Sequence, residues 1–396
     1  MNQLVTPDLF KKLVAVRRDL HQHPELSGHE FRTADTIIQF LKNAGFSNIS
    51  RVANTGVIAE IPGPSHTPWI ILRADTDALP IKEETNLAFS SVNEGIMHAC
   101  GHDGHTAMLL GAAELLAKET NLPAPVRFIF QPAEEKGAGA KAMIQEGALE
   151  NGGMIFGGHL DRHYPTGTLV VTDGPVNAST DTFLVEILGQ GAHGARPHES
   201  IDAVVVGSLL VMSLQTIVSR EVDPAFPSVV SIGRFQSGTA SNVIAGQATL
   251  EGTIRAQHPA VRKHLHTAIQ RIANSIGQLH GANTTTTIHL GTPPVINSPE
   301  MAALSRQGAA LTVGQENVLP LRTANMGGED FSYYLEKVPG AYIRFGSQVP
   351  GLESFPAHSS KFDFDEQALA VGASYFHRMA ILAGQQLLNQ TPQTEV

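Results

Sequence analysis

The stretch His98–His105 constrains the fold of this chain more than any other. Within it lie three histidines, the only cysteine of the protein, one aspartate and two glycines, which let a loop bend tightly. A thiolate and a neutral imidazole are good ligands for zinc-like ions, and the spacing from Cys100 to His102 lets both reach one centre from a turn. The pattern favours a metal-binding loop. A buried thiol among structural histidines would leave the same pattern.

The composition narrows the class of protein. A chain of 396 residues with 42% hydrophobic residues can build two domains. A net charge of -10 argues against a nucleic acid partner and favours a small-molecule substrate. One cysteine allows no intrachain disulfide, and residues 1–8 lack the pattern of a signal peptide. The apolar run 203–218 is interrupted by polar residues and too short for a membrane span, so we expect a core helix, no membrane partner and a cytoplasmic location.

Upstream of the histidine-rich stretch, apolar spacing predicts helices over residues 8–23 and 30–44. The motif His21–Glu25 between them is either a ligand cluster or, since Pro24 ends the first helix, a structural turn, and the turn is favoured. A predicted strand over 69–72 runs into Asp75 and Asp77. These carboxylates either belong to a site at the carboxyl edge of a sheet or are solvated loop residues.

Downstream, two further buried strands end in polar groups. A predicted helix over 107–117 and a strand over 126–130 precede Glu134 and Glu135, and the run 154–158 precedes His159. Neighbouring side chains on a first helical turn point about 100° apart, so one carboxylate can bind a metal while the other faces a water. We therefore expect these strand ends to converge on the metal loop.

The pattern changes between residues 181 and 290. There the predicted order is β-α-β-β-α-β, which matches a ferredoxin-like split unit. We expect a catalytic domain of α/β class, with a mixed sheet flanked by helices, over residues 1–178 and 293–396. An inserted ferredoxin-like lid or dimerisation domain would occupy 179–292. A cap and first-turn proline at Ser298–Glu300, a strand over 341–345 and a helix over 365–388 complete the pattern.

Taken together, the motifs resemble the dimetal amidohydrolases and metallopeptidases of the aminoacylase and carboxypeptidase type. The resemblance is nearest to the branch with hippurate hydrolase, N-acyl-amino-acid amidohydrolases and indole-acetyl-amino-acid hydrolases. It spans nearly the whole chain, in the motifs Arg18–Glu25, Leu72–Pro80, His98–His105, Gln131–Glu135, Gly189–His193, Gly327–Phe331 and His358 with Phe362–Glu366.

The resemblance implies roles for matching residues. Two divalent ions (Zn, Mn, Co or Ni) would be held by Cys100 as a bridging thiolate and by His102, Glu135, His159 and His358. Glu134 would be the general base that takes a proton from a water between the ions. His193 would donate to the oxyanion from the partner subunit of a homodimer, or of a dimer of dimers. No covalent intermediate is needed.

Other positions are open to two interpretations. Asn242 and Arg255 match residues that grip the substrate carboxylate, although Arg255 could equally pair with a surface acid. Asp75, Asp77 and Asp103 are interpreted as partners that orient the histidines rather than as ligands. Residues 160–164 depart from the commoner family pattern, which has aromatic and proline residues after the ligand histidine, and His163 lies within reach of the site.

The resemblance implies a metal-dependent hydrolase of linear amide bonds, which cleaves N-acyl or N-aroyl amino acids to a carboxylic acid and a free amino acid. A dipeptidase or carboxypeptidase on the same scaffold is the alternative, although no dedicated acidic motif for a free amine is evident. A third possibility is an enzyme that uses Cys100 as a nucleophile with a histidine base. Such an enzyme would stay active after a chelator removed its metal. A non-catalytic metal-binding protein would have no need of Glu134 beside Glu135.

Overall fold

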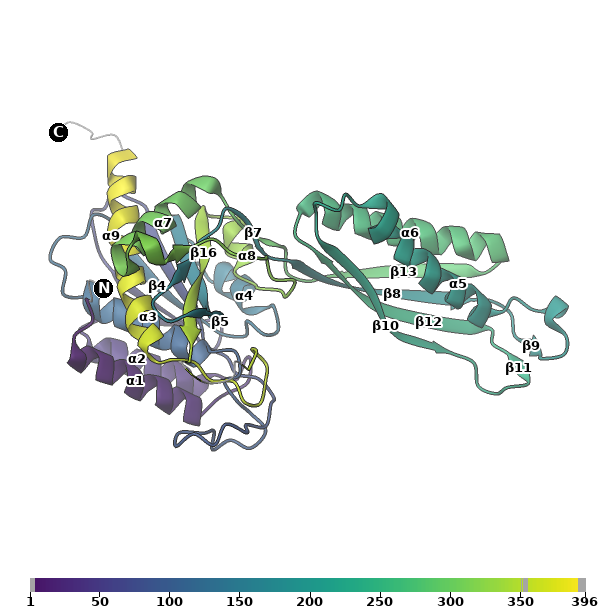
Figure 1. Cartoon of the computed structure of the whole chain (residues 1–396), viewed down its shortest axis with the longest axis horizontal. Coiled ribbons are helices and arrows are strands. Elements are labelled where there is room, and N and C mark those ends of the chain that lie inside the picture. The colour runs from purple at the N-terminus through teal and green to yellow at the C-terminus, as the bar shows by residue number, and fades with distance from the viewer. Residues whose placement is uncertain (1–3, 350, 352–354, 391–396) are drawn as a thin grey trace. The chain divides into compact units, whose positions relative to one another are not determined.

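The computed structural model describes residues 4–349, 351 and 355–390, which form two compact units (Figure 1). Unit 1 combines Met1–Val176, Ile296–Thr323 and Asp330–Val396. Unit 2 combines Asn177–Val295 with the short segment Ala324–Glu329. The chain therefore leaves unit 1, builds most of unit 2 as an insertion and returns.

Unit 1 is built on an eight-stranded mixed sheet with the order β1-β2-β4-β3-β5-β16-β6-β15. Its strands are β1 (Ile49–Val52), β2 (Gly56–Ile61), β3 (Trp69–Asp75), β4 (Val126–Gln131), β5 (Gly152–Pro165), β6 (Leu169–Val170), β15 (Val318–Leu319) and β16 (Gly340–Gln348). The central strands β4, β3, β5 and β16 run parallel to one another. Strands β3, β4 and β16 are almost wholly buried because helices cover the sheet, which explains their apolar runs, whereas the second half of β5 is partly exposed. The predicted α/β class is confirmed.

The helices of unit 1 are α1 (Pro7–Gln22), α2 (Phe31–Asn43), α3 (His102–Leu116), α4 (Gly139–Gln145), α7 (Pro299–Val313), α8 (Ser332–Leu335) and α9 (Gln367–Gln390). Thr6 and Ser298 cap α1 and α7 ahead of a first-turn proline, as the sequence predicts for α7. Helix α3 packs against α9, α1 and the sheet, so nearly all of its residues are buried. This burial fixes the amino end of α3, where the histidine-rich stretch enters the helix.

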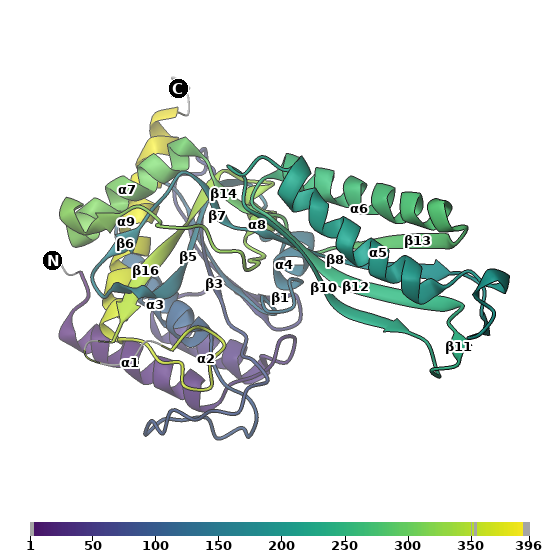
Figure 2. The same cartoon turned by 45° about the vertical axis from the view of Figure 1, so that its right-hand side comes forward.

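Unit 2 has the order β8 (Ser179–Leu188), α5 (Ala203–Thr216), β10 (Ser228–Ser237), β12 (Gln247–Ala256), α6 (Pro259–His280) and β13 (Asn283–Leu290). Its antiparallel sheet has the order β10-β12-β8-β13, so the predicted β-α-β-β-α-β arrangement is present. Helices α5 and α6 lie side by side on one face of this sheet (Figures 1 and 2). A small ribbon joins β9 (Ala192–His193) to β11 (Val243–Ile244). Outside both large sheets, the short strands β7 (Gly174–Asn177) and β14 (Val295–Asn297) pair with each other.

Helix α5 is only partly the core helix that the sequence suggests. It buries Val206, Leu210 and Leu214 in unit 2, while Val205 and Met212 are 48% and 69% exposed. Among the described residues, the segment Ala203–Glu221 is one helical stretch whose length and mean hydropathy of 1.6 would allow a membrane span, and 33% of that window is buried. Such a stretch is weak evidence for a membrane, since core helices of soluble proteins pass the same test.

Three boundaries differ from the predictions. Helix α3 begins at His102 rather than near Ala107, so half of the expected loop is the first helical turn. Glu134 lies in a turn before α4 instead of on a first helical turn. Strand β5 continues to Pro165, so His159 lies within the strand and not after its end. Local sequence patterns gave no signal for these boundaries because tertiary packing sets them.

Candidate metal centre

The turn into α3 positions Cys100 and His102. Gly101 has a φ of 93°, in the left-handed region that glycine adopts without strain. A Cβ at Gly101 would lie 3.0 Å from the side chain of Leu160, so the position is also sterically tight. This turn leaves Cys100 buried just before the helix, with His102 as the first helical residue.

Five of the predicted site residues meet in unit 1. Cys100 Sγ lies 3.2 Å from His159 Nε2, and His358 Nε2 lies 3.3 Å from Glu135 Oε1. His102 Nε2 lies 4.0 Å from the same Glu135 oxygen. The ligand atoms of Cys100, His102 and His159 all lie within 4.8 Å of one another, and so do those of Cys100, Glu135 and His358. Cys100 is shared by both groups, which is the arrangement that a bridging ligand requires.

Asp77 orients this cluster from the loop after β3. Its backbone oxygen and Oδ1 lie 2.9 Å and 3.2 Å from His102 Nδ1, so Nδ1 donates and the lone pair of Nε2 points away from Asp77. Asp77 Oδ2 accepts from the amide of Glu135 at 3.0 Å and from the hydroxyl of Ser27 at 2.7 Å. One carboxylate therefore fixes both a histidine and the neighbouring turn.

The donor set fits divalent cations. His102 Nε2 is buried and has no hydrogen-bond partner among the described residues, and the buried Glu135 Oε1 has the ion-pair contact with His358 given above. Burial raises the pKa of Cys100 to about 12, and the Glu135 carboxylate acts in the same direction, so the thiol is protonated without a nearby cation. A buried imidazole nitrogen without a partner and a thiol that needs positive charge to ionise are the features expected of a metal site with sulfur, nitrogen and oxygen ligands.

His105 has a different task from His102. Its Nδ1 donates to Asp75 Oδ1 at 2.6 Å, while its Nε2 accepts the amide proton of Leu160 at 2.9 Å. Strand β3 pairs with β5 only as far as Phe156. Beyond that point His105 accepts the backbone hydrogen bond of β5 that a neighbouring strand would otherwise accept. Asp75 is in turn held by Arg73 Nη1 at 2.8 Å. Both nitrogens of His105 are thus engaged: Nε2 supports β5 and Nδ1 contacts Asp75 at the end of β3.

Asp103 contacts a histidine that is not one of the candidate ligands. Its Oδ2 contacts Arg17 Nε and His21 Nδ1, each at 2.9 Å, and among the described residues it has no hydrogen bond to a candidate ligand. His21 also contacts Glu83 at 3.3 Å, so it is a buried structural histidine, as favoured from the sequence. Glu25 accepts from two amides at the start of α2, which agrees with a structural role for the rest of that motif.

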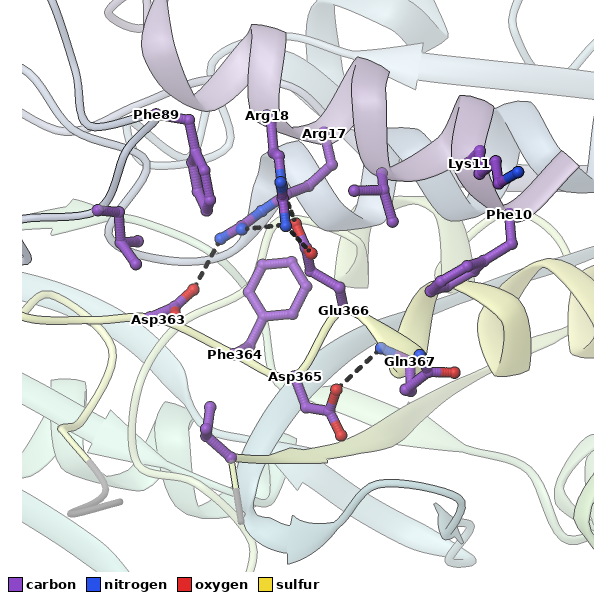
Figure 3. Close-up of a pocket in the computed structure, with 13 residues that line it drawn as sticks. Phe10, Lys11, Arg17, Arg18, Phe89, Asp363, Phe364, Asp365, Glu366 and Gln367 are labelled. Atoms are coloured by element: carbon purple, nitrogen blue, oxygen red, sulfur yellow. Dashed lines mark hydrogen bonds and ion pairs between the residues drawn. The ribbon is translucent and has the colours of Figure 1, made fainter. Parts of the chain in front are cut away.

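Sequence reasoning missed the role of Arg17. Its guanidinium is 1% exposed, contacts Asp363 and Glu366 besides Asp103, and lies over the rings of Phe89 and Phe364. Figure 3 shows Arg17 with Phe89, Asp363, Phe364 and Glu366 around a pocket beside α1. The pocket has a volume of about 510 Å³. A charged residue one position after Val16, on the buried side of an amphipathic helix, was the only local signal.

Glu134 and Glu135 occupy the turn after β4. Glu134 Oε1 accepts from the amide of Asp330 at 3.4 Å, and its ligand atom lies within 4.8 Å of those of His102 and Glu135. Ala133 has a φ of 52°, an unusual value that turns the chain sharply before the two glutamates. The turn therefore keeps both adjacent carboxylates close to His102.

The remaining predicted residues belong to unit 2. His193 and Asn242 lie together in the small ribbon, where the amide of Gly194 donates to the Asn242 carbonyl at 2.8 Å, and both are exposed. Arg255 lies apart from them, on β12 opposite Thr180 of β8. The eight-residue step from Gln247 to Arg255 spans about 26 Å along the strand. Unit 2 thus carries these predicted residues at its two opposite ends.

Comparison with known proteins identifies the family of this chain. The model of peptidase family M20/M25/M40 matches residues 71–381. This chain belongs to that family. It is 41% identical over 369 residues to N-acetyl-L-cysteine deacetylase of Bacillus subtilis, covering 93% of this chain and 87% of the relative.

Other similar proteins include a carboxypeptidase and a peptidase of known structure. Thermostable carboxypeptidase 1 of Saccharolobus solfataricus is 38% identical over 372 residues, covering 91% of this chain and 92% of the relative. A crystal structure of a Bacillus subtilis dinuclear metal binding peptidase of the M20 family superposes with a TM-score of 0.84. It is 37% identical and covers 98% of this chain and 100% of that chain. The family and this neighbour support two metal ions as the cofactor.

Proposed function

We propose that this protein is a metal-dependent amidohydrolase that cleaves N-acyl or N-aroyl amino acids to a carboxylic acid and a free amino acid. The observation that carries the proposal is the pair of ligand groups that share Cys100, with Glu134 beside them. The family and the deacetylase relative support the same reaction class.

In this proposal Cys100, His102, Glu135, His159 and His358 would hold two divalent ions. Zinc, manganese, cobalt and nickel all suit such mixed ligands. Such ions would lower the pKa of a bound water and polarise the scissile carbonyl. Asp77 keeps His102 in the tautomer that presents Nε2.

Glu134 then acts as the general base and general acid. It accepts a proton from the attacking water and returns it to the leaving nitrogen, so the amide bond breaks with no covalent enzyme intermediate. The bond from the Asp330 amide holds one Glu134 oxygen in place. The adjacent carboxylate of Glu135 would bind the cations.

Unit 2 supplies the remaining contacts in this proposal. Arg255 and Asn242 bind the substrate carboxylate, and His193 donates to the oxyanion. His193 and Asn242 lie at the end of unit 2 remote from Ser179 and Ala256, where the chain connects to unit 1. That location supports a role for these two residues in the site of the partner subunit.

A homodimer through unit 2 is part of the proposal. The exposed apolar side chains Val204, Val205, Leu209 and Met212 form one patch on α5. Within the part of the chain that the structure describes, strand β10 pairs only with β12 and therefore has an open edge next to that helix. A second copy would cover both features. With one cysteine and no disulfide, we place the dimer in the cytoplasm.

Hydrolysis of a panel of N-acetyl, N-benzoyl and indole-acetyl amino acids tests the reaction. Activity should disappear on chelation, return on metal addition and fall by about 10²–10⁴ in Glu134→Gln with the metal content unchanged. Glu94→Gln, an exposed glutamate in a loop, is the matched control. Full activity in Glu134→Gln or in metal-free enzyme would contradict the proposal.

A carboxypeptidase or dipeptidase is the second candidate. It is favoured by the carboxypeptidase relative, which aligns with 91% of this chain. Dipeptides belong on the same panel, and turnover of dipeptides alone would select this candidate.

A further inference from the structure

The segment Asp161–His163 follows the candidate ligand His159 on β5 and has no part in the mechanism above. Strand β5 stays regular as far as Asp161, because residues 344–346 of β16 pair in register with residues 159–161. Side chains alternate along a strand, so His159 and Asp161 share one face with Cα atoms about 7 Å apart.

Burial follows this alternation. Leu160 is buried and packs toward Gly101 and Gly104, whereas the side chain of Asp161 is 19% exposed and that of His163 is 78% exposed. The face that begins at His159 therefore opens toward solvent at Asp161. Along β5 itself, the next side chain on the face of His159 is that of Asp161.

The Asp161 carboxylate is held in one orientation. Oδ1 accepts from the backbone amide of His163 at 2.9 Å and from its ring Nδ1 at 2.8 Å. Oδ2 has no hydrogen-bond partner among the described residues. His163 thus positions Asp161 and leaves one carboxylate oxygen as an acceptor for a ligand.

Two arginines nearby do not occupy that oxygen. Arg162 faces the other way, with Nη1 3.4 Å from the carbonyl of Phe355 and its guanidinium 6.0 Å from the Phe362 ring. Arg344 pairs in register with His159 and is 5% exposed, so it is less accessible than Asp161. The accessible charge on this face, two residues beyond His159, is negative.

We propose that Asp161 is a specificity-determining residue that accepts a hydrogen bond from an amine on the distal part of the substrate acyl group. This inference rests on the proposed amidohydrolase activity and narrows its substrate class to acyl groups with an amine several bonds beyond the scissile carbonyl. His163 is a positioning residue that acts through Asp161.

Matched substrate pairs test the inference. Each pair carries the same alanine leaving group and differs only by an amine: benzoyl against 4-aminobenzoyl, and butanoyl against 4-aminobutanoyl. In at least one pair, we expect the kcat/KM of wild-type enzyme to be about tenfold higher for the substrate with the amine than for its parent, mostly through a lower KM. One charge-assisted hydrogen bond contributes a difference of this size. Asp161→Asn should abolish this preference and leave the parent substrates within about twofold.

Further variants separate recognition from structure. His163→Ala should reduce the preference without abolishing it, since Asp161 remains. Asp8→Asn, the same chemical change at an exposed site on α1, is the matched control and should change nothing. Metal content is measured in every sample.

The other outcomes would overturn the inference, alone or together with the proposed function. If parent substrates are hydrolysed without any preference for the amine, or if Asp161→Asn slows both members equally, the inference is wrong and the amidohydrolase proposal stands. A preference for 4-carboxybenzoyl would also overturn it and assign the face to Arg344. If no substrate is hydrolysed by metal-loaded wild type, the proposed function and the inference both fail.

Discussion

The buried contact between Arg17 and Asp103 gives the sharpest stability prediction. Both side chains are at most 1% exposed, and their atoms are 2.9 Å apart. Burial alone would raise the pKa of Asp103, but the Arg17 guanidinium, with help from His21, holds that pKa far below its usual range. The pair joins α1 to the first turn of α3, next to the metal cluster.

Arg17→Met leaves a buried carboxylate without its main partner. Breaking a buried pair in this way costs about 3–5 kcal/mol of unfolding free energy. Adding Asp103→Asn to that variant removes the uncompensated charge, so the double variant should regain about 2 kcal/mol relative to the sum of the single changes. Arg18→Met is the matched control, because Arg18 is 48% exposed and its pair with Glu366 should contribute at most about 1 kcal/mol.

The pH dependence has a defined sign. A carboxylate with a lowered folded-state pKa adds stability above its unfolded pKa near 4, and loses it as pH falls toward the folded value. The cost of Arg17→Met should therefore be largest at neutral pH and shrink below about pH 4.

Trp69 provides the assay, since it is the only tryptophan and lies at the start of β3 in unit 1. Urea unfolding followed by its fluorescence, at equal metal content, yields the free energies for the four proteins of the cycle. Additivity within about 0.5 kcal/mol would refute the reasoning, as would an equal cost for Arg17→Met and Arg18→Met.

Three more predictions follow from other sites. Burial lowers the pKa of His98 to about 4, so the unfolded state binds more protons between about pH 6.5 and 4, and unit 1 should lose up to about 3 kcal/mol over that window. His98→Gln should flatten this dependence in the Trp69 assay; an unchanged slope would contradict it. In unit 2, buried Asp181 contacts Arg262 at 2.6 Å and His266 at 2.8 Å, so Asp181→Asn should cost about 3 kcal/mol and speed amide exchange in β8 and β13 but not in unit 1. Met212→Glu should shift sedimentation from dimer to monomer, whereas Leu279→Glu, on an apolar residue of α6 that is 74% exposed, should not; a monomeric wild type would end the dimer proposal.

Much of the fold could be predicted because local patterns and the large-scale topology agree. The alternation of 181–188 and the cap at Ser298 are local signals, and both elements form as expected. The start of α3 could not be predicted, because residues 102–106 are polar or small and become helical through burial against α1, α9 and the sheet. Long-range packing overrode weak local propensity there.

The candidate site, too, could be predicted only in part from the sequence. Side chains at strand ends could be expected to converge, and Cys100, His102, Glu135, His159 and His358 do lie together. Their partners could not be assigned from spacing. Asp77 reaches His102 across 25 residues and Asp103 reaches Arg17 across 86, so only the folded chain reveals which acid serves which group.

A cobalt titration of metal-free protein tests the two-ion site most directly. The near-ultraviolet absorption of a cobalt–thiolate bond and the hydrolysis rate are recorded in the same samples. We predict that both rise together and saturate at two equivalents per chain, that Glu134→Gln keeps the absorption without the activity, and that Cys100→Ser loses the absorption. Saturation at one equivalent, or full activity in Cys100→Ser, would contradict a catalytic pair of ions bridged by Cys100.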